Sequence, residues 1–278
     1  MNFNGNTILV SNSANRGGGI FGDTKATLIL GGVSNFVNNT AHSSGGGIYL
    51  QRSTITSNVT GNISFNGNLA NYTGGGIYAE SSLMNFSGIV NIRRNHAQIY
   101  GGGVFTKDST LSLSASITFS ENIADLLGGG AYVEGGKLHL LGNTFHSNLA
   151  AMYGGGIYSQ NTSISFTGNN LFINNFAREN GGAVYSYVSY LNFSRTNTTF
   201  RNNFSIKGGG FYLGSKSFCF LMSDTRIIMT NNAAERQGGA IYVEDTSSYI
   251  HCLPDEFRRR VVQDNIDGPH DVLGPLYF

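Results

Sequence analysis

Carboxylate side chains recur at one position of a repeated pattern and are the first candidates for chemistry. Glu80, Asp108 and Glu134 fall in three successive copies, each in the polar turn after an aliphatic-aromatic pair. Such side chains can bind calcium, and paired carboxylates hydrolyse glycosidic bonds. The equivalent turn carries Gln51 and Gln160 in other copies, which favours ordinary solvated turn residues. We therefore predict no catalytic residue and no metal ligand in this chain.

Three other features could carry chemistry, and each is weaker. The stretch GGGIFG at 17–22 has the spacing of a dinucleotide-binding loop, but such a loop opens a helix and here a strand-like run follows. We expect no cofactor. His139 and His146 share one repeat without the further ligands of a zinc site. Cys219 and Cys252 lie in successive repeats, so a disulfide between them is one interpretation and two separate thiols the other.

A glycine triplet that recurs nine times sets the organisation of the chain. The triplets begin at Gly17, Gly45, Gly74, Gly101, Gly128, Gly154, Gly181, Gly208 and Gly238, which are 26 to 30 residues apart. Each is followed by an aliphatic-aromatic pair, then by a short alternating run, and then by an apolar-x-x-Asn-x-Ala segment. These runs have the period of two typical of strands and lack the 3.6 period of helices. We predict an all-β fold, a single right-handed parallel β-helix with about nine coils of ~27 residues and three short strands per coil.

Each position of a β-helix stacks on its own copies in the neighbouring coils, ~4.8 Å away. A sharp corner repeated in every coil requires glycine, and the aliphatic residue beside it is expected to point into the core. The asparagine of each Asn-x-Ala segment is predicted to join a buried ladder of side-chain hydrogen bonds. The predicted ladder comprises Asn12, Asn39, Asn68, Asn95, Asn122, Asn148, Asn175, Asn203 and Asn232.

The aromatic residue of each pair is expected to point outward if its aliphatic neighbour points inward. The predicted outer face comprises Phe21, Tyr49, Tyr78, Phe105, Tyr132, Tyr158, Tyr185, Tyr212 and Tyr242. A strip of rings that is apolar in body and polar at its tips is either a structural ladder or a contact face for glycans or another protein. The opposite phase, with the tyrosines inside the core, is the alternative.

Composition limits the classes of partner. The chain has 278 residues, of which 40% are hydrophobic and 12% charged, and its formal net charge is +1. We therefore expect no nucleic-acid partner. No apolar run reaches the ~18 residues of a membrane span, and no signal peptide opens the chain. Because Met1 opens in mid-repeat, we expect a fragment whose export signal lies upstream. Residues 1–250 are predicted to form the β-helix domain, and 251–278, which hold all three prolines, a cap or irregular tail.

Two motifs alternate along the chain: Phe-x-x-Asn and Gly-Gly-Gly/Ala followed by an aliphatic residue, as in FVNN…GGGIY, FINN…GGAVY and MTNN…GGAIY. This alternation, over residues 1 to about 245, resembles the repeats of chlamydial polymorphic outer membrane proteins and of similar sponge-type eukaryotic proteins. The resemblance implies a non-enzymatic protein, extracellular or at the cell surface, with an adhesive or structural role. A polysaccharide-binding or polysaccharide-degrading β-helix is the alternative. Nine Asn-x-Ser/Thr sequons would make it a glycoprotein if its source is eukaryotic.

Overall fold

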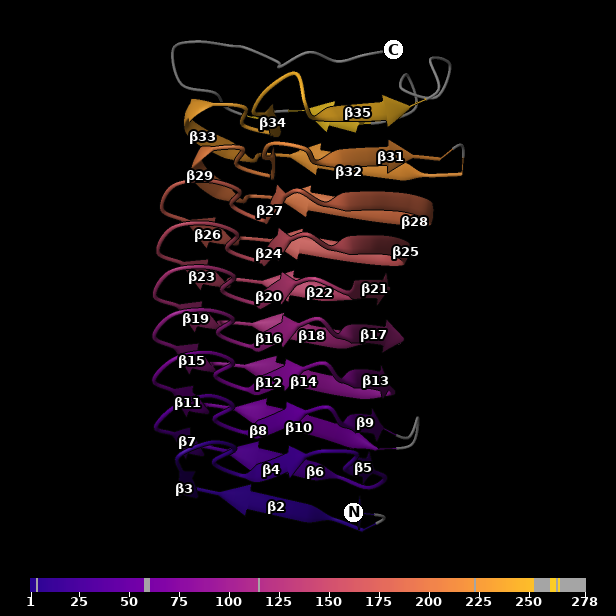
Figure 1. Ribbon diagram of the computed structural model, residues 1–278. Helices are drawn as coiled ribbons and strands as arrows, with labels where there is room; N and C mark the ends of the chain where they lie inside the picture. Colours follow the sequence, from indigo (N-terminus) through magenta and orange to yellow (C-terminus); the bar gives the residue numbers. More distant parts are fainter. Residues whose placement is uncertain are drawn as a thin grey trace.

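The chain winds into a parallel β-solenoid of about nine turns, about 27 residues apart, as a computed structural model shows (Figure 1). The structure describes residues 1–3, 5–57, 61–114, 116–222, 224–252, 261–263 and 265. Every described strand pair is parallel, and the strands form three sheets. The described part contains no helix, and so none that could cross a membrane. The predicted all-β parallel β-helix is confirmed.

Sheet C is built from the aliphatic-aromatic pairs that follow the glycine triplets. Its nine strands stack one per coil with no slip in register: Ile77, for example, lies between Ile48 and Val104. The strands are β4 (Ile20–Asp23), β8 (Ile48–Gln51), β12 (Ile77–Glu80), β16 (Val104–Lys107), β20 (Ala131–Glu134), β24 (Ile157–Gln160), β27 (Val184–Tyr187), β30 (Phe211–Leu213) and β34 (Ile241–Val243).

Sheet A has eighteen strands in two rows, because most coils contribute two strands separated by a turn. The first row contains β1 (Asn2–Phe3), β5 (Thr27–Leu30), β9 (Thr54–Ser57), β13 (Leu83–Ser87), β17 (Thr110–Ser114), β21 (Lys137–Leu141), β31 (Phe218–Leu221) and β35 (Tyr249–Cys252). The second row contains β2 (Thr7–Val10), β6 (Ser34–Val37), β10 (Asn62–Asn66), β14 (Ile89–Arg93), β18 (Ile117–Ser120), β22 (Thr144–His146), β32 (Arg226–Thr230) and β36 (Val261–Gln263). Two long strands, β25 (Ser163–Ile173) and β28 (Tyr190–Arg201), run through both rows.

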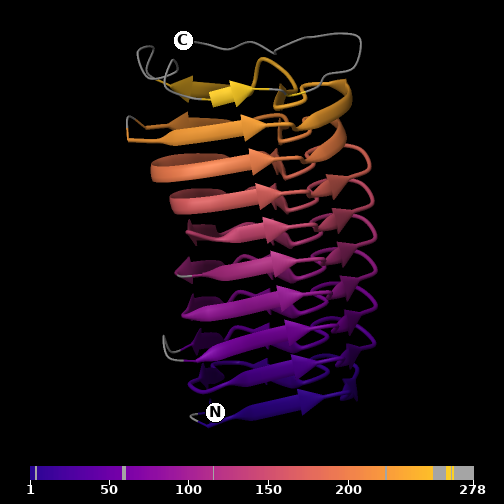
Figure 2. The ribbon, with the colours of Figure 1, turned by 180° about the vertical axis from the view of Figure 1, so that it is seen from behind.

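Sheet B consists of short strands that follow the asparagine corner and form the left-hand column of Figure 1. Turned by 180°, the same column lies on the right (Figure 2). The strands are β3 (Ser13–Ala14), β7 (Thr40–Ala41), β11 (Leu69–Ala70), β15 (His96–Ala97), β19 (Ile123–Ala124), β23 (Leu149–Ala150), β26 (Phe176–Ala177), β29 (Phe204–Lys207) and β33 (Ala233–Gln237). A short loop leads from most of these strands to the next glycine triplet, whereas β29 and β33 run directly into the triplets at Gly208 and Gly238.

The main core lies between the three sheets and is filled by residues of one face of each strand. The aliphatic residues of sheet C are buried there, as predicted, with Ile48, Ile77 and Ile157 each 0% exposed. The phenylalanines of the Phe-x-x-Asn segments stack on one another, and the rings of Phe119 and Phe145 lie 4.5 Å apart. Their burial explains why this position is so often phenylalanine, since a large ring fills the width of the solenoid.

The glycine triplet forms the corner between sheet B and sheet C. The first glycine of all nine triplets has a φ between 62 and 72°, the left-handed region that residues with a Cβ avoid. A Cβ on the second glycine would meet backbone carbonyls of the next coil, as Gly46 shows against Leu69 and Gly75. The third position accepts alanine at Ala183 and Ala240. The triplet is therefore structural, and strand β4 begins at Ile20 within GGGIFG, where a dinucleotide loop would lead into a helix.

The stack continues past residue 250. Strand β36 pairs with β32 in parallel register, and Asn265 hydrogen-bonds Asn232 of the preceding coil. The rest of the predicted cap or tail at 251–278 lies outside the described residues.

Candidate interaction surfaces

A ladder of asparagine side chains runs along the corner between sheets A and B. In every rung the side-chain Nδ2 donates to the Oδ1 of the next asparagine at 2.8–3.1 Å, and the backbone N–H donates to the same oxygen. Nδ2 also donates to a carbonyl of the preceding coil, as Asn122 does to Ile92 O at 2.8 Å. The predicted ladder is confirmed from Asn12 to Asn232, and Asn265 extends it by one rung.

The residue before each internal ladder asparagine adopts a left-handed conformation, for example Asn38 (φ 51°), Glu121 (φ 55°) and Asn174 (φ 56°). Asparagine tolerates this conformation better than most residues. The requirement explains the Asn-Asn pairs at the end of several Phe-x-x-Asn segments. In each corner, the left-handed residue changes the direction of the chain, and the asparagine after it hydrogen-bonds the equivalent asparagines of the neighbouring coils.

A second polar ladder, which the sequence analysis missed, runs along the corner between sheets C and A. The backbone N–H of Ser53 donates to the Ser82 hydroxyl at 3.1 Å, and that of Ser82 to the Ser109 hydroxyl at 2.9 Å. After an interruption at Gly136 the same bonds continue through Thr162, Ser189, Ser217 and Ser248. The signal in the sequence was a serine or threonine two residues after the last residue of several sheet C strands.

The predicted aromatic ladder exists, and its phase is the one predicted. The rings from Phe21 to Tyr242 lie outside the main core and stack on one another, with centroids 4.6–5.2 Å apart. The expectation that they form an exposed outer face is wrong, because Tyr132 is only 4% exposed and Tyr158 only 6%. Most of this candidate contact face is therefore closed to a partner.

The loops between sheet B and the glycine triplets cover the aromatic ladder. Tyr100 stacks on Tyr132 and Tyr153 on Tyr185, each at 4.9 Å, and Leu127 packs between these two tyrosines of the loops. The ladder and the loops together form a second, smaller core. The signal in the sequence was the apolar residue directly before the triplets at 101, 128 and 154.

Burial changes the acid-base behaviour of the ladder tyrosines. Desolvation raises the pKa of Tyr158 to about 12, with smaller contributions from neighbouring tyrosines. Burial also raises the pKa of Tyr78, Tyr132, Tyr185 and Tyr212. These phenols are therefore protonated at any physiological pH and act as neutral side chains.

The carboxylates that opened the sequence analysis do not converge. In sheet C, Lys107 lies between Glu80 and Glu134 in register, and its Nζ is 3.8 Å from a Glu134 oxygen. Asp108 lies one position further along, in the turn. Glu80 instead accepts hydrogen bonds from Gln51 and from the hydroxyl of its own strand's tyrosine. Across the part of the chain that the structure describes, no three His, Cys, Asp or Glu residues form a metal-binding group.

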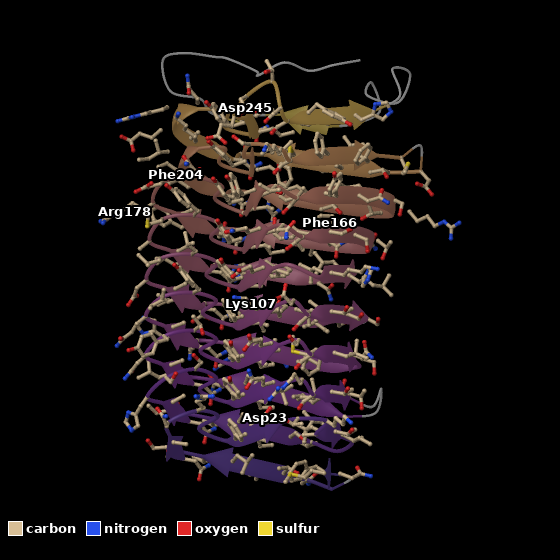
Figure 3. All side chains as sticks on the ribbon, viewed as in Figure 1. Asp23, Lys107, Phe166, Arg178, Phe204 and Asp245 are labelled. Carbon is tan, nitrogen blue, oxygen red and sulfur yellow. The ribbon has the colours of Figure 1, made fainter. Side chains whose placement is uncertain are left out.

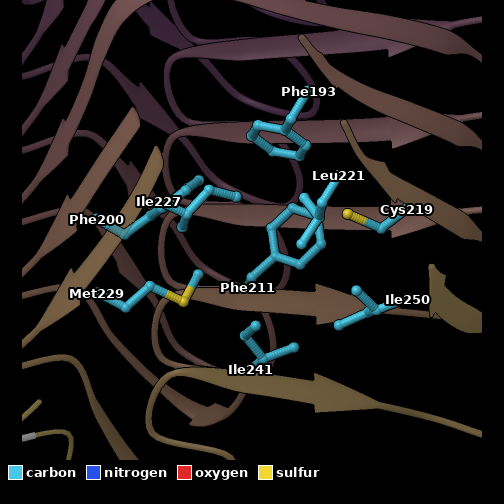
Figure 4. A pocket seen from close by; sticks show the side chains of 9 residues that line it. All are labelled: Phe193, Phe200, Phe211, Cys219, Leu221, Ile227, Met229, Ile241 and Ile250. Carbon is cyan, nitrogen blue, oxygen red and sulfur yellow. The ribbon is translucent and has the colours of Figure 1, made fainter. Parts of the chain in front are cut away.

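The two cysteines lie on adjacent strands of the first row of sheet A. Cys219 stands opposite Ile250, and Leu221 opposite Cys252, so the cysteines are two positions apart along the strands. The side chain of Cys252 lies outside the described part, and the disulfide stays a prediction. Cys219 lines a small apolar cavity of about 20 Å³ together with Phe193, Phe211 and other core residues (Figure 4). The cavity is enclosed by apolar side chains and offers no polar group to a ligand.

Two stacked sets of apolar side chains lie on the outer faces of the sheets and are exposed or partly exposed. The first, which we call the outer aromatic row, consists of Tyr190, Phe218 and Tyr249 on adjacent strands of sheet A. Tyr190 is 55% exposed, and the ring centroids lie 5.1 and 4.8 Å apart. Val188 beside it has a φ of 51°, which is strained for a β-branched residue.

The second set, the sheet B stripe, consists of Ile123, Leu149, Phe176 and Phe204. These are the variable residues of four Asn-x-Ala/Ser segments, and they stack in register on β19, β23, β26 and β29. Each is 36–40% exposed. Figure 3 shows Phe204 and Arg178 on this edge of the rod. The stripe is not evident from the sequence alone, because the same position holds Ser13, Thr40, Leu69, His96 and Ala233 in other coils.

Comparison with known proteins identifies the repeat. The Chlamydia polymorphic membrane protein repeat matches residues 34–51, 62–80, 171–187 and 226–244. Each match covers a second-row strand of sheet A, the asparagine corner, a strand of sheet B, the glycine corner and a strand of sheet C. No curated protein and no solved structure matches the chain. The repeats suggest a surface or outer-membrane location and agree with a non-enzymatic role. The chain is thus a parallel β-solenoid that carries Chlamydia polymorphic membrane protein repeats.

Proposed function

We propose that this chain is a non-enzymatic segment of an extracellular or cell-surface protein that serves in adhesion, and that the outer aromatic row contacts the glycan of a target surface. The repeat type supports the location. The single observation that carries the adhesive role is the row itself, since three aromatic rings lie in line on the face of a rigid sheet and one of them is more than half exposed. Exposed apolar patches on rigid elements commonly mark interaction sites.

A glycan suits this surface better than a charged ligand. Tyr190 is exposed and Phe218 and Tyr249 are partly exposed. The three rings follow one another along the solenoid axis, with tilts of 34° and 57° between neighbouring ring planes. The C–H groups on one side of a pyranose ring pack against an aromatic face, and the tyrosine hydroxyls can hydrogen-bond the sugar hydroxyls. Successive rings would contact successive sugars, which gives weak contacts at several points.

The test is binding of the purified chain to a glycan array and to cells, measured per folded molecule. Tyr190→Ser together with Phe218→Ser removes two rings of the row. Tyr72→Ser is the matched control, because Tyr72 is 53% exposed in another part of the rod. We expect the double variant to lose binding and the control to keep it, with both retaining the β-sheet circular dichroism spectrum of the parent. Equal binding by the double variant and the parent would remove the row from the proposal.

A further inference from the structure

We infer that the sheet B stripe is a site of self-pairing, in which two copies of this chain lie side by side with their solenoid axes antiparallel. The inference concerns a different surface from the outer aromatic row and does not depend on glycan binding. It rests on the apolar stripe and on the charges beside it.

Two opposite charges lie symmetrically about the Leu149 level of the stripe. Asp125, Ala151 and Arg178 occupy equivalent positions on three successive coils, since Ala151 N donates to Ala124 O and Arg178 N to Ala150 O. Leu149 belongs to the middle coil of the three. Because coils are ~4.8 Å apart, the acid and the base lie about 5 Å on either side of the Leu149 level.

A two-fold axis in the plane of the interface, perpendicular to the solenoid and at the level of Leu149, generates the antiparallel pair. It brings Leu149 against its own copy and Ile123 against Phe176 of the second molecule. Phe204, the fourth residue of the stripe, then lies at the level of His96 of the second molecule. It also brings Asp125 against Arg178 of the second molecule, and by symmetry the same pair forms twice. The small side chain of Ala151 at the centre leaves room for the two faces to approach.

The parallel arrangement is disfavoured by the same residues. If the two solenoid axes point in the same direction, residues on one side of the stripe in one molecule face residues on the other side of the stripe in the second molecule, at the same coil level. Asp125 would then face Glu121 of the second copy, which is already paired with Arg94 at 2.7 Å. Arg178 would face the neutral Asn174. Neither Asp125 nor Arg178 would gain a partner of opposite charge. Charge complementarity therefore selects the antiparallel pair and identifies a second copy of the chain as the occupant.

The two charged side chains are available for this contact. Asp125 pairs with His96 at 2.8 Å, and its side chain remains 49% exposed. Arg178 is exposed and forms no ion pair with any residue in the described part of the chain. A stripe four coils long gives an interface below the ~1,200 Å² of stable complexes, so we expect weak, concentration-dependent association.

Two single charge reversals test the geometry. In Asp125→Arg both symmetric contacts become Arg–Arg, and in Arg178→Asp both become Asp–Asp. Each variant alone should associate about tenfold more weakly than the parent, because two attractive pairs become repulsive. When the two variants are mixed, the arginine introduced into one meets the aspartate introduced into the other. The native Arg178 of the first variant then meets the native Asp125 of the second, so the mixture should form heterodimers.

Sedimentation velocity over a concentration series, with one variant carrying a fluorescent label, measures all three cases. Lys137→Asp is the matched control for Arg178→Asp, since it makes the same change from a positive to a negative side chain at an exposed site on sheet A. It should associate like the parent. A parent that stays monomeric at the highest concentration would overturn the inference, and so would a mixture that associates no better than each variant alone. Neither result bears on glycan binding by the outer aromatic row, which is measured separately.

Discussion

Replacing Asn122 by leucine removes one internal rung of the asparagine ladder and leaves the backbone intact. The Asn122 side chain makes four hydrogen bonds: it accepts from the backbone N–H and the Nδ2 of Asn95, and it donates to Asn148 Oδ1 and to Ile92 O. In Asn122→Leu the backbone N–H and one Nδ2–H of Asn95 lose their acceptor, and the carbonyl of Ile92 loses one donor. The other Nδ2–H of Asn95 keeps its bond to Phe65 O. Asn148 Oδ1 still accepts the backbone N–H of residue 122.

Two buried N–H groups of Asn95 are thus left without an acceptor. Each costs about 1–3 kcal/mol, so the free energy of unfolding should fall by about 2–6 kcal/mol, with local relaxation favouring the lower half of that range. One kcal/mol shifts the Tm of a large domain by about 2–4 °C. We therefore expect Asn122→Leu to lower the Tm by about 5–15 °C, measured by circular dichroism melting and by urea unfolding.

The control is Asn12→Leu at the first rung. Asn12 is exposed and donates to Asn39 Oδ1, which keeps the backbone N–H of residue 12 as a donor. No buried group loses its only partner, and the Tm should change by no more than about 2 °C. Equal Tm values for the two variants would show that the ladder does not stabilise the solenoid in the way that its hydrogen bonds indicate.

Three further predictions follow from the covered aromatic ladder and its neighbours. Tyr132→Ser with Tyr158→Ser should lower the stability by about 3 kcal/mol or more while leaving glycan and cell binding per folded molecule unchanged, because both rings are buried; lost binding with unchanged melting would contradict this. The protein should lose stability as the pH rises from about 10 to about 12. The unfolded chain releases tyrosine protons near pH 10, whereas burial raises the pKa of Tyr158 in the folded state to about 12. Urea unfolding midpoints at pH 9 and pH 11 would test this, and equal midpoints would refute it. Val188→Asn should raise the Tm by a few degrees, because it replaces a β-branched residue in a left-handed conformation by one that tolerates this conformation. Asn161 already occupies the equivalent corner with φ 52°. An unchanged or lower Tm would count against backbone strain at Val188.

The repeat made most of the fold predictable from the sequence. Because each coil stacks on copies of itself, a fixed spacing of glycine triplets and asparagines was enough to place the corners, the three sheets and the asparagine ladder. The inward direction of Ile48 and its equivalents followed from alternation within one strand. These features depend on positions that nearly every coil shares.

The exposed surfaces were less predictable because they depend on residues that vary between coils. The aromatic ladder was expected to face solvent, and only the loops carrying Tyr100, Leu127 and Tyr153 reverse that expectation. The loop residues have no regular alternation of apolar and polar residues, so the sequence does not show that the loops fold over the aromatic ladder. The sheet B stripe likewise consists of four successive large apolar residues at a position that is mixed in the other coils, so it becomes visible only once the register is known.

The coil-to-coil register also determines which changes of length the rod tolerates. A deletion of residues 101–127 would join Tyr100 to Gly128, bring Asn95 against Asn148 and Tyr78 against Tyr132, and leave every stack continuous. The rod would be shorter by ~4.8 Å and otherwise unchanged. A deletion of one residue within a strand would instead turn every following side chain of that strand to the wrong face. Loss or gain of one whole repeat would therefore give a shorter or longer rod that still folds, so that the length of the solenoid can change in steps of one turn.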